Sequence, residues 1–499
     1  MGDHILAIDQ GTTGTTVLVI DLHGAVHARA SVPVPQHFPG PGMVEHDAVE
    51  IAAGVETAVA EALRLWGQDP HRLGAIGITN QRETTVLWER RSGRPLHRAI
   101  VWQDRRTAEM CASLREEGVE SLVYERAGLL LDPYFSGTKI AWLLDHIEGA
   151  RARAAAGELA FGTIDTWLVS YLTGGAHVTD VTNASRTLLL SLKTRQWDDA
   201  LLGALGVPRQ ILPEVVPSAG VFGRTKGFAG LPDGIPIAGI AGDQQAALFG
   251  QGCFQKGDVK CTYGTGAFVL MNVGAEPVPS KHRLLSTIGW EIPGEVVYAL
   301  EGSAFVAGAA VQWLRDGLGL IASSAEIEVL ARTVPDAGEV VFVPALTGLG
   351  APYWDPAARG LLTGLGRDTT RGHIARACLD GIALEIADLV DAMAADAGAP
   401  IASMRADGGA AANDLLLQIQ ADVAGTRVVR PRVVETTAMG AGMLAAIGAG
   451  MVTSRDEIAG ALTVERTFSP SAETAAAEQL RHRWKVAVAR ALQHSGSRA

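Results

Sequence analysis

Hydrophobic runs near the start of the chain predict two strands joined by a tight turn. The apolar segments ILAIDQ (5–10) and TTVLVID (15–21) are separated by the short polar sequence GTTG (11–14). Glycines allow the backbone of such a turn to adopt positive φ and to expose N–H groups. We therefore predict a hairpin with an acid, Asp9, beside its turn.

The hydrophobic spacing then changes to that of a helix. Apolar residues recur every three or four positions from Ile51 to Trp66, and Asp47 precedes them as a candidate N-cap. Residues 74–81 predict a buried strand, and residues 235–252 predict a strand, a glycine turn and a helix. This alternation is typical of an α/β fold with its functional polar residues just past strand ends.

The opening pattern returns in the middle of the chain. Residues 258–274 again predict strand, Gly/Thr turn and strand, with the turn at Gly264–Gly266. Strand and helix patterns alternate after it, including a long helix over 372–397. We expect two related domains, residues 1–250 and 251–499, so that a nucleotide bound between them would meet one hairpin from each.

Length and charge limit the function classes. A chain of 499 residues exceeds what one hydrophobic core usually supports. The formal charge of −12 argues against nucleic acids and anionic membranes as partners, because both favour clustered Lys and Arg.

Other features bear on the cellular compartment. The four cysteines have no C-x-x-C spacing and predict buried thiols: Cys111, Cys253, Cys261 and Cys378. Asp9 interrupts the first apolar run and no basic segment precedes it, so we expect no signal peptide and a cytoplasmic location. The uncharged run 436–454 approaches membrane-spanning length, but its repeated glycines favour a closely packed internal helix and no membrane span.

Both predicted hairpins suit phosphate chemistry. Backbone N–H groups and the hydroxyls of Thr12, Thr13 and Thr265 could hold phosphate oxygens, and Asp9 could hold Mg²⁺ through water. A single Gly/Thr turn is most often only a turn, and the second copy is what supports the hypothesis. The chain has no P-loop motif, and the glycines of GAGMLA at Gly440 indicate helix packing because no buried strand precedes them.

Seven motifs together resemble one enzyme family. They are, in order, DQGTTG, NQRET, AIVWQDRRT, PYFSGTK, GDQQAALFGQ, TYGTGAF and ALTGLGAPYWDPAARG, from Asp9 to about Gly450. This set is similar to the FGGY carbohydrate kinases, and NQRET, WQDRR and PYFSGTK resemble the branch that phosphorylates glycerol. The resemblance implies two duplicated ribonuclease-H-like domains of the actin-like ATPase type, with a central cleft that closes over ATP, Mg²⁺ and glycerol and yields sn-glycerol 3-phosphate.

The resemblance also implies residue roles. Asp243 matches the catalytic base. Asp9 and Asp243 are the candidates to hold the metal, through water. The acceptor positions are matched by Arg82, Glu83, Tyr134, Asp243, Gln244, Trp102 and Phe268. The nucleotide positions are matched by Thr265, Gly308, Gln312, Gly409 and Asn413. The first hairpin adds further candidates for nucleotide binding, which are Thr12, Thr13, Gly14 and Thr16.

Simpler interpretations exist for each of these residues taken alone. Arg82 and Glu83 would usually be a solvated pair on a loop, and Asp243 could be only a helix N-cap. Trp102 and Phe268 would usually be core residues. The joint occurrence of these residues, in order and with both hairpins, favours the functional interpretation.

The sequence departs from the family pattern in two places. Thr16 stands where the family usually has Arg, and Thr cannot offer a bidentate cationic contact to phosphate. We therefore expect a weaker nucleotide contact there, or compensation by another cation. Residues 227–234 contain no Lys or Arg, so we expect no inhibition by a sugar bisphosphate at this loop.

Two rival functions remain open from the sequence. The first is an FGGY kinase for another polyol or ketopentose, such as erythritol or xylulose, because only the acceptor pocket would differ. The second is a non-catalytic, nucleotide-dependent binding or chaperone module of the actin-like type, which is disfavoured because no peptide-binding domain remains. A homodimer or homotetramer is compatible with the resemblance.

Overall fold

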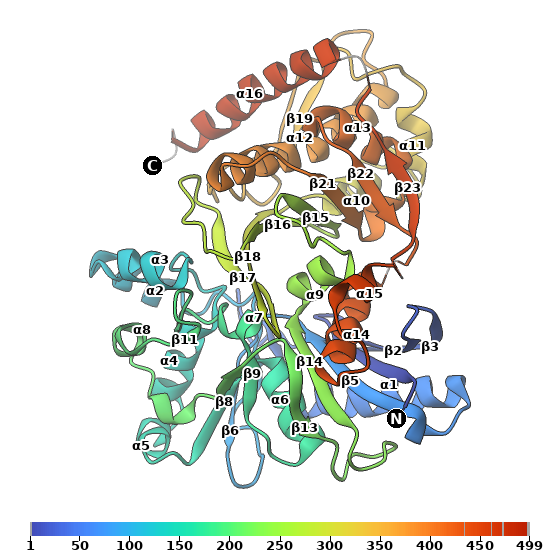
Figure 1. Ribbon diagram of the computed structural model, residues 1–499. Helices are drawn as coiled ribbons and strands as arrows, with labels where there is room; N and C mark the ends of the chain where they lie inside the picture. Colours follow the sequence, from blue (N-terminus) through green and yellow to red (C-terminus); the bar gives the residue numbers. More distant parts are fainter. Residues whose placement is uncertain (1, 434, 461, 472–473, 497–499) are drawn as a thin grey trace.

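Two large sheets form the centres of two lobes (Figure 1). The computed structural model describes all residues except 1, 434, 461, 472–473 and 497–499.

The sheet of the first lobe has six strands. Their spatial order is β13 (Ala219–Arg224), β14 (Pro236–Gly242), β5 (Leu73–Asn80), β1 (His4–Gln10), β2 (Gly14–Asp21) and β3 (Val26–Pro33). The pairs β1–β5 and β5–β14 are parallel, and the pairs β1–β2, β2–β3 and β13–β14 are antiparallel.

The sheet of the second lobe repeats this arrangement with one strand added at the edge. Its order is β17 (Leu285–Ile292), β18 (Glu295–Ala304), β16 (Ala267–Gly274), β15 (Asp258–Tyr263), β21 (Ser403–Asp407), β22 (Val428–Pro431) and β23 (Val464–Phe468). From β18 to β23 the directions match those from β3 to β13, with two antiparallel pairs, two parallel pairs and one antiparallel pair. The predicted duplication of an α/β unit is confirmed.

Side-chain alternation in the first sheet produces two separate apolar layers. Leu6 and Ile8 of β1 belong to a buried cluster with helix α1 (Ala48–Trp66), whereas Ile5 and Ala7 belong to a cluster on the other face. Asp47 caps α1 as predicted, with its carboxylate accepting the N–H groups of residues 49 and 50. A sheet covered on both faces explains why its strands are almost continuously apolar.

Helix α14 (Thr436–Gly448) belongs to the second half of the chain but packs on the sheet of the first lobe. It contacts β14, β5, β1 and helix α9 (Asp243–Gly250). A Cβ at Gly440 would lie 1.9 Å from the carbonyl oxygen of Ala246, and one at Gly250 would lie 2.0 Å from that of Thr436. Only glycines allow this approach, which confirms the predicted internal helix and the interpretation of GAGMLA as helix packing.

The remaining helices are distributed over both halves of the chain. The first lobe also contains α2 (Ala108–Glu116), α3 (Val119–Ala127), α4 (Ser136–His146), α5 (Ala150–Ala155), α6 (Ile164–Thr173), α7 (Val181–Ala184) and α8 (Asp199–Leu205). Later in the chain come α10 (Gly308–Asp316), α11 (Glu326–Ala331), α12 (Arg371–Ala397), α13 (Asp414–Ala424), α15 (Arg455–Ala459) and α16 (Thr474–Gly496). Within the described residues, no helix has both the length and the apolar character needed to cross a membrane.

Short strands and 3-10 turns complete the fold. The strands are β4 (Glu45–His46), β6 (Val86–Glu89), β7 (Ala99–Ile100), β8 (Leu159–Gly162), β9 (Val178–Asp180), β10 (Leu190–Ser191), β11 (Gln196–Trp197), β12 (Glu214–Val216), β19 (Val341–Val343) and β20 (Leu361–Thr363). The 3-10 turns are η1 (Pro70–Arg72), η2 (Arg209–Ile211) and η3 (Gly409–Ala412). All four cysteines are free and buried, as predicted.

Candidate active site

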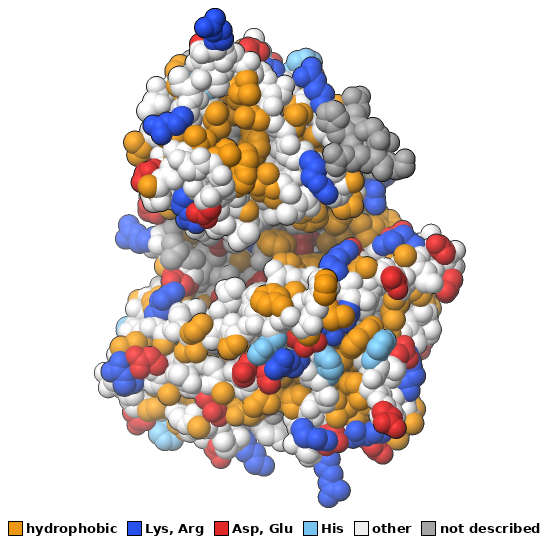
Figure 2. All heavy atoms as spheres, turned by 180° about the vertical axis from the view of Figure 1, so that it is seen from behind, with side chains coloured by type: hydrophobic (Ala, Val, Ile, Leu, Met, Phe, Trp, Pro, Cys, Tyr) orange, Lys and Arg blue, Asp and Glu red, His pale blue; other side chains and the backbone are white. Residues whose placement is uncertain are grey.

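Each of the two predicted hairpins is closed by a backbone hydrogen bond, which spans four residues in the first turn and three in the second. Gly11 N donates to Gly14 O at 2.9 Å in the first turn, and Gly264 N donates to Gly266 O at 2.8 Å in the second. Trp102 connects them: its indole Nε1 donates to Thr12 Oγ1 at 2.9 Å, and its ring centroid lies 6.5 Å from that of Phe268, just after the second turn. The two turns therefore lie close to each other. A hollow between the two lobes is visible in Figure 2.

Asp243 stands where strand β14 ends and helix α9 begins. The N-cap of this helix is Gly242, and Asp243 is the first helical residue, so the N-cap interpretation of Asp243 is wrong. Its Oδ1 accepts the backbone N–H of Gln244 at 2.7 Å, and 30% of the side chain remains exposed. The carboxylate is therefore held by the helix start and is still accessible from the cleft.

Asp9, on β1, lies near enough to Asp243 to be influenced by its charge. Burial and the like charge of Asp243 raise the pKa of Asp9 to about 7. Two carboxylates in this relation repel each other, and a divalent cation bound through water would relieve that repulsion. In the described part of the chain, no group of three or more Asp, Glu, His or Cys side chains is placed to hold a metal ion.

Arg82 and Glu83 follow the end of β5 and are buried, in contrast to the solvated pair that two adjacent charges usually form. Glu83 has a φ of 61°, which is unusual for a residue other than glycine. Arg82 Nε lies 3.2 Å from Asp243 Oδ1, and its Nη2 donates to Tyr134 OH at 3.3 Å. The structure thus brings the predicted acceptor residues Arg82, Glu83, Tyr134 and Asp243 together.

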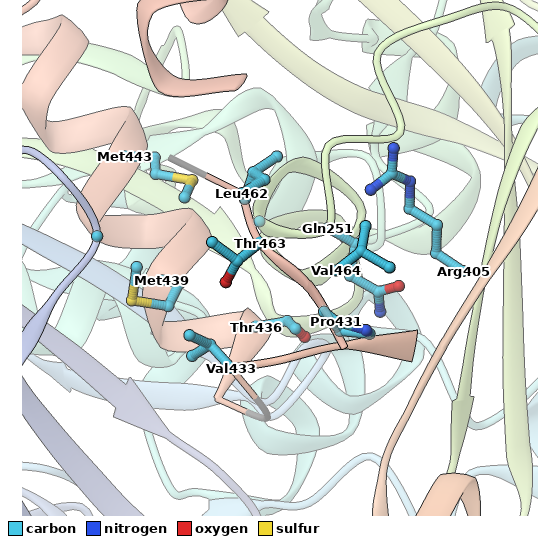
Figure 3. Close-up of a pocket in the computed structure, with 12 residues that line it drawn as sticks. Gln251, Arg405, Pro431, Val433, Thr436, Met439, Met443, Leu462, Thr463 and Val464 are labelled. Carbon is cyan, nitrogen blue, oxygen red and sulfur yellow. The ribbon is translucent and has the colours of Figure 1, made fainter. Parts of the chain in front are cut away.

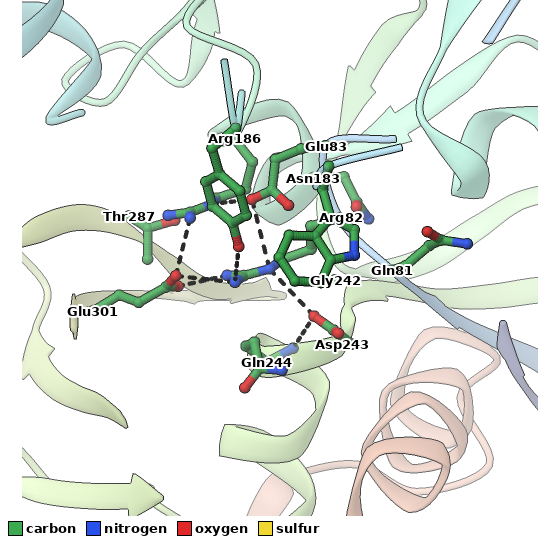
Figure 4. A network of polar contacts seen from close by, with 12 residues as sticks. Gln81, Arg82, Glu83, Asn183, Arg186, Gly242, Asp243, Gln244, Thr287 and Glu301 are labelled. Atoms are coloured by element: carbon green, nitrogen blue, oxygen red, sulfur yellow. Dashed lines mark hydrogen bonds and ion pairs between the residues drawn. The ribbon is translucent and has the colours of Figure 1, made fainter. Parts of the chain in front are cut away.

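Two further charged residues complete this cluster, and the sequence analysis missed both (Figure 4). Glu301 of β18 accepts from Arg82 Nη1 at 2.5 Å and from Arg82 Nη2 at 3.0 Å. Arg186, just after α7, donates to Glu83 at 2.7 Å through Nε and to Glu301 at 3.0 Å through Nη2. The available signal was a lone carboxylate inside the apolar strand VVYALEGSA, where an unpaired charge would be costly.

The charges of this cluster stabilise one another. Burial disfavours the carboxylate of Glu301, but Arg186 and Arg82 outweigh it and lower the pKa of Glu301 to about 2. Burial likewise opposes the charge of Arg82, yet Glu301, Glu83 and Asp243 leave its pKa well above the usual range. For Glu83 burial wins over the neighbouring arginines, and its pKa is raised.

Gln244 is held from the second lobe. Lys260 of β15 donates its ammonium to Gln244 Oε1 and, at 2.9 Å, to Thr262 Oγ1. Burial lowers the pKa of Lys260, and the charges of Asp407 and Asp243 partly offset this effect. Because an ammonium can only donate, it identifies the bonded atom of Gln244 as oxygen and leaves the amide NH₂ for another acceptor. Lys260 is a third residue that the motifs did not identify.

A cavity of about 420 Å³ lies in the second lobe beside its hairpin. All five second-half residues predicted to bind nucleotide line it: Thr265, Gly308, Gln312, Gly409 and Asn413. Gly308 begins α10 and donates its N–H to Gly264 O at 3.0 Å, while Asn413 caps α13. The sequence analysis missed the other walls, which are Tyr263, Gly264, Val311, Ser324, Ala325, Ile327, Glu328, Leu379, Ala410, Ala412 and Leu416.

The first-hairpin residues predicted to bind nucleotide do not line this cavity. Thr12, Thr13 and Gly14 lie at the turn between β1 and β2, next to Trp102. Thr16 lies farther along β2, where its hydroxyl is within 3.0 Å of Ser31 Oγ.

A second, smaller recess of about 30 Å³ lies between α14, the end of α9 and strands β22–β23 (Figure 3). Its walls include Gln251, Arg405, Met439 and Leu462. None of the predicted site residues lines it, and its size excludes a nucleotide.

Comparisons with known proteins match nearly the whole chain. The N-terminal domain of the FGGY family of carbohydrate kinases matches residues 4–250, and the C-terminal domain of that family matches residues 259–449. Glycerol kinase from Myxococcus xanthus is 57% identical over 491 residues, which cover 98% of this chain and 99% of that protein. Glycerol kinase from Alkalilimnicola ehrlichii is 56% identical, with 98% of each chain covered.

Solved structures give the same result. The crystal structure of Plasmodium falciparum glycerol kinase with ADP superposes with a TM-score of 0.93 at 34% identity, covering 98% of both chains. A ligand-bound xylulose kinase from Lactobacillus acidophilus shares the fold, with a TM-score of 0.90 at 22% identity over 99% of this chain and 100% of that one. The predicted resemblance is confirmed, and the chain belongs to the FGGY family of carbohydrate kinases.

Proposed function

We propose that the chain is a glycerol kinase, which transfers the γ-phosphoryl group of ATP to glycerol and releases ADP and sn-glycerol 3-phosphate. The observation that carries this proposal is the grouping of Arg82, Glu83, Tyr134 and Asp243 at the cleft, between the two Gly/Thr hairpins. The identity to curated glycerol kinases over nearly the whole chain supports the acceptor.

The acceptor residues suit a small triol. Glycerol offers three hydroxyl groups that donate and accept hydrogen bonds, and the Arg82 guanidinium, the Glu83 carboxylate and the Gln244 amide provide complementary partners. Trp102 and Phe268 supply apolar surface for the carbon backbone, with Trp102 packed edge-on to Tyr134 at a centroid distance of 5.6 Å.

Asp243 is the proposed general base. A carboxylate is too weak a base to remove an alcohol proton in the ground state, so proton transfer accompanies attack on the γ-phosphorus. Arg82, bound to the same carboxylate, keeps it oriented toward the acceptor. Positioning and charge neutralisation supply most of the rate in such a reaction.

The cavity in the second lobe is the proposed ATP site. Backbone N–H groups near Gly264 and Gly409 suit phosphate oxygens. Aliphatic walls such as Ile327 and Leu416 suit the flat apolar surface of the adenine ring. The hairpin Thr12, Thr13 and Gly14 would meet the terminal phosphate from the other lobe.

Mg²⁺ is the proposed metal, bound with the nucleotide. Asp9 and Asp243 fit it, because burial and the charge of Asp243 both disfavour the Asp9 carboxylate, a divalent cation would stabilise it, and both residues offer hard oxygen ligands. When bound, the ion would neutralise phosphate charge, while Asp9 and Asp243 orient its water ligands. Cytoplasmic location and a homodimer or homotetramer stay predictions.

An acceptor comparison tests the proposal. Purified protein is supplied with ATP, Mg²⁺ and either glycerol, erythritol or xylulose, and ADP release is measured. We expect the highest kcat/KM with glycerol. A higher kcat/KM with erythritol or xylulose would show that glycerol is not the preferred acceptor but would leave the kinase activity in place. ATP turnover that none of the three acceptors stimulates would contradict both the acceptor and the kinase activity.

A further inference from the structure

The acceptor site contains a buried ion-pair network that joins the two lobes. Arg82 and Glu83 belong to the first lobe, and Arg186 comes from the segment after α7. Glu301 belongs to β18, in the sheet of the second lobe. The side chains of all four residues are at most 2% exposed.

Glu301 holds the end of Arg82 that is opposite Asp243. Its two carboxylate oxygens bind Nη1 and Nη2 of Arg82, while Asp243 binds Nε of the same guanidinium. A bidentate contact fixes the plane of a guanidinium as well as its position. Since Arg82 and Asp243 are the proposed acceptor-binding and base residues, the orientation of both depends on a side chain that arrives from the other lobe.

Arg186 secures Glu301 in turn. It bridges Glu301 to Glu83 and lies over the rings of Tyr134 and Phe135, with its guanidinium carbon 5.6 Å and 5.1 Å from their centroids. The strand that carries Glu301 ends at Ala304, and Gly308 of the proposed nucleotide site begins the next helix. A shift of β18 on nucleotide binding would therefore move Glu301 as well.

We infer that Glu301 is a positioning residue that orients Arg82 from the second lobe, so that the acceptor site is complete only when the nucleotide-holding lobe is docked. This inference rests on the proposed function. It adds a residue to the reaction and gives a physical route by which nucleotide binding increases acceptor affinity.

The test compares Glu301→Gln with wild type. The amide keeps the size of the side chain but removes the charge and one acceptor oxygen. We expect kcat/KM for glycerol to fall about 100-fold, the size of loss that follows misplacement of reacting groups, while KM for ATP changes less than about threefold. Glu301→Asp keeps the charge on a shorter arm and should recover about tenfold of that loss.

Calorimetry measures the coupling between nucleotide and glycerol binding, which a merely structural role of Glu301 would not change. Glycerol affinity is measured with and without a non-hydrolysable ATP analogue. Wild type should bind glycerol more tightly with the analogue, and Glu301→Gln should lose most of that ratio.

Glu45→Gln is the matched control. Glu45 is also a buried glutamate paired with an arginine, 2.7 Å from Arg106 Nη2, but it lies outside the network. Glu45→Gln should lower Tm without changing kcat/KM for glycerol or the ratio of glycerol affinities with and without the ATP analogue. Kinetics of Glu301→Gln within threefold of wild type, or losses equal to those of Glu45→Gln, would overturn the inference.

Substitute variants cover the case in which Glu301→Gln does not fold. If Glu301→Gln gives no cooperative unfolding transition, Glu301→Asp and Arg186→Lys replace it, because a lysine ammonium cannot bridge two carboxylates as a guanidinium does. Each should lose about tenfold in kcat/KM for the acceptor, and wild-type values would overturn the inference. All ratios use the acceptor that wild type turns over fastest, so a wrong acceptor affects only the proposed function.

Discussion

The two sides of the cleft are built from different groups. On the acceptor side, Arg82 lies within 4 Å of three carboxylates, those of Glu83, Asp243 and Glu301. The cavity in the second lobe is lined mainly by backbone, glycine and aliphatic side chains, and among its described lining residues Glu328 is the only charged one.

This difference follows from the proposed ligands. A small triol can be oriented only through its hydroxyl groups, which requires several polar side chains fixed in place. A nucleotide has a large apolar base and a phosphate chain, which suit aliphatic walls and backbone N–H groups. Changes to charge should therefore affect the acceptor side most, and changes to backbone shape should affect the nucleotide side.

The largest effect is expected at Asp243. Asp243→Asn removes the proposed base but keeps the shape of the side chain, so kcat should fall about 1,000-fold. Glycerol affinity, measured by calorimetry, should change only a few-fold because Arg82, Glu83 and Gln244 remain. Turnover close to that of wild type would show that Asp243 serves only the local structure of the helix start.

On the nucleotide side, Gly409→Ala should raise KM for ATP without disturbing the fold. An added Cβ at Gly409 meets no atom within 4 Å, so the protein itself should tolerate it. A phosphate chain that approaches this backbone would meet the methyl group, and KM for ATP should rise about tenfold, a loss of 1 to 2 kcal/mol like that of one displaced contact.

Gly54→Ala in helix α1 is the control for this change, because its added Cβ also meets no atom within 4 Å. Gly409→Ala should keep the wild-type Tm, whereas Gly54→Ala should raise it slightly because alanine favours the interior of a helix. Both variants should keep the wild-type KM for glycerol. An unchanged KM for ATP in Gly409→Ala would remove Gly409 from the site.

Asp9 should give a pH-dependent effect on stability. Its pKa is about 7 in the fold and 3.8 when unperturbed, so the unfolded chain releases this proton at lower pH than the folded chain does. The stability that Asp9 contributes therefore falls as pH rises from about 4 to 7 and is constant above that range. Asp9→Asn removes the free-energy cost of ionising this buried side chain in the folded state.

Thermal unfolding measures this prediction. We expect the Tm of Asp9→Asn to exceed that of wild type most at pH 8, with the difference narrowing toward pH 4, while kcat falls through loss of the proposed metal contact. A Tm difference that does not vary with pH would contradict the raised pKa.

The smallest effect is expected at Thr16. Thr16→Arg introduces the cation that the family usually has on the first hairpin, and KM for ATP should fall about threefold, since an exposed charge contact contributes less than about 1 kcal/mol. Thr57→Arg, an exposed position on α1, makes the same charge change away from the cleft and should leave KM unchanged. Equal values for both variants would show that Thr16 does not face the nucleotide.

Periodicity predicted the elements that position the site. The two hairpins, the N-cap at Asp47, strand β5 and the strand-to-helix transition before Asp243 all follow from local patterns, because each depends on residues within a few positions of one another. Residues carried by motifs, such as Arg82 and Gly409, were found for the same reason.

The missed residues share a different property. Glu301, Arg186 and Lys260 belong to no motif used here, and each acts through a partner more than 15 positions away in the chain. Their importance comes from burial and pairing, and neither is visible in a local pattern. A buried charge is informative only when its partner is known.

The sequence by itself thus determined the α/β elements, their duplication and the family, and it supplied most of the side chains proposed to contact ligands, since these depend on short-range periodicity and on motifs. Only the tertiary structure decided that α14 returns to the first lobe and that Glu301 reaches across to Arg82. The reason is physical: the free energy of a buried ion pair, or of two helices in glycine-to-backbone contact, depends on distances between atoms that the chain brings together only on folding.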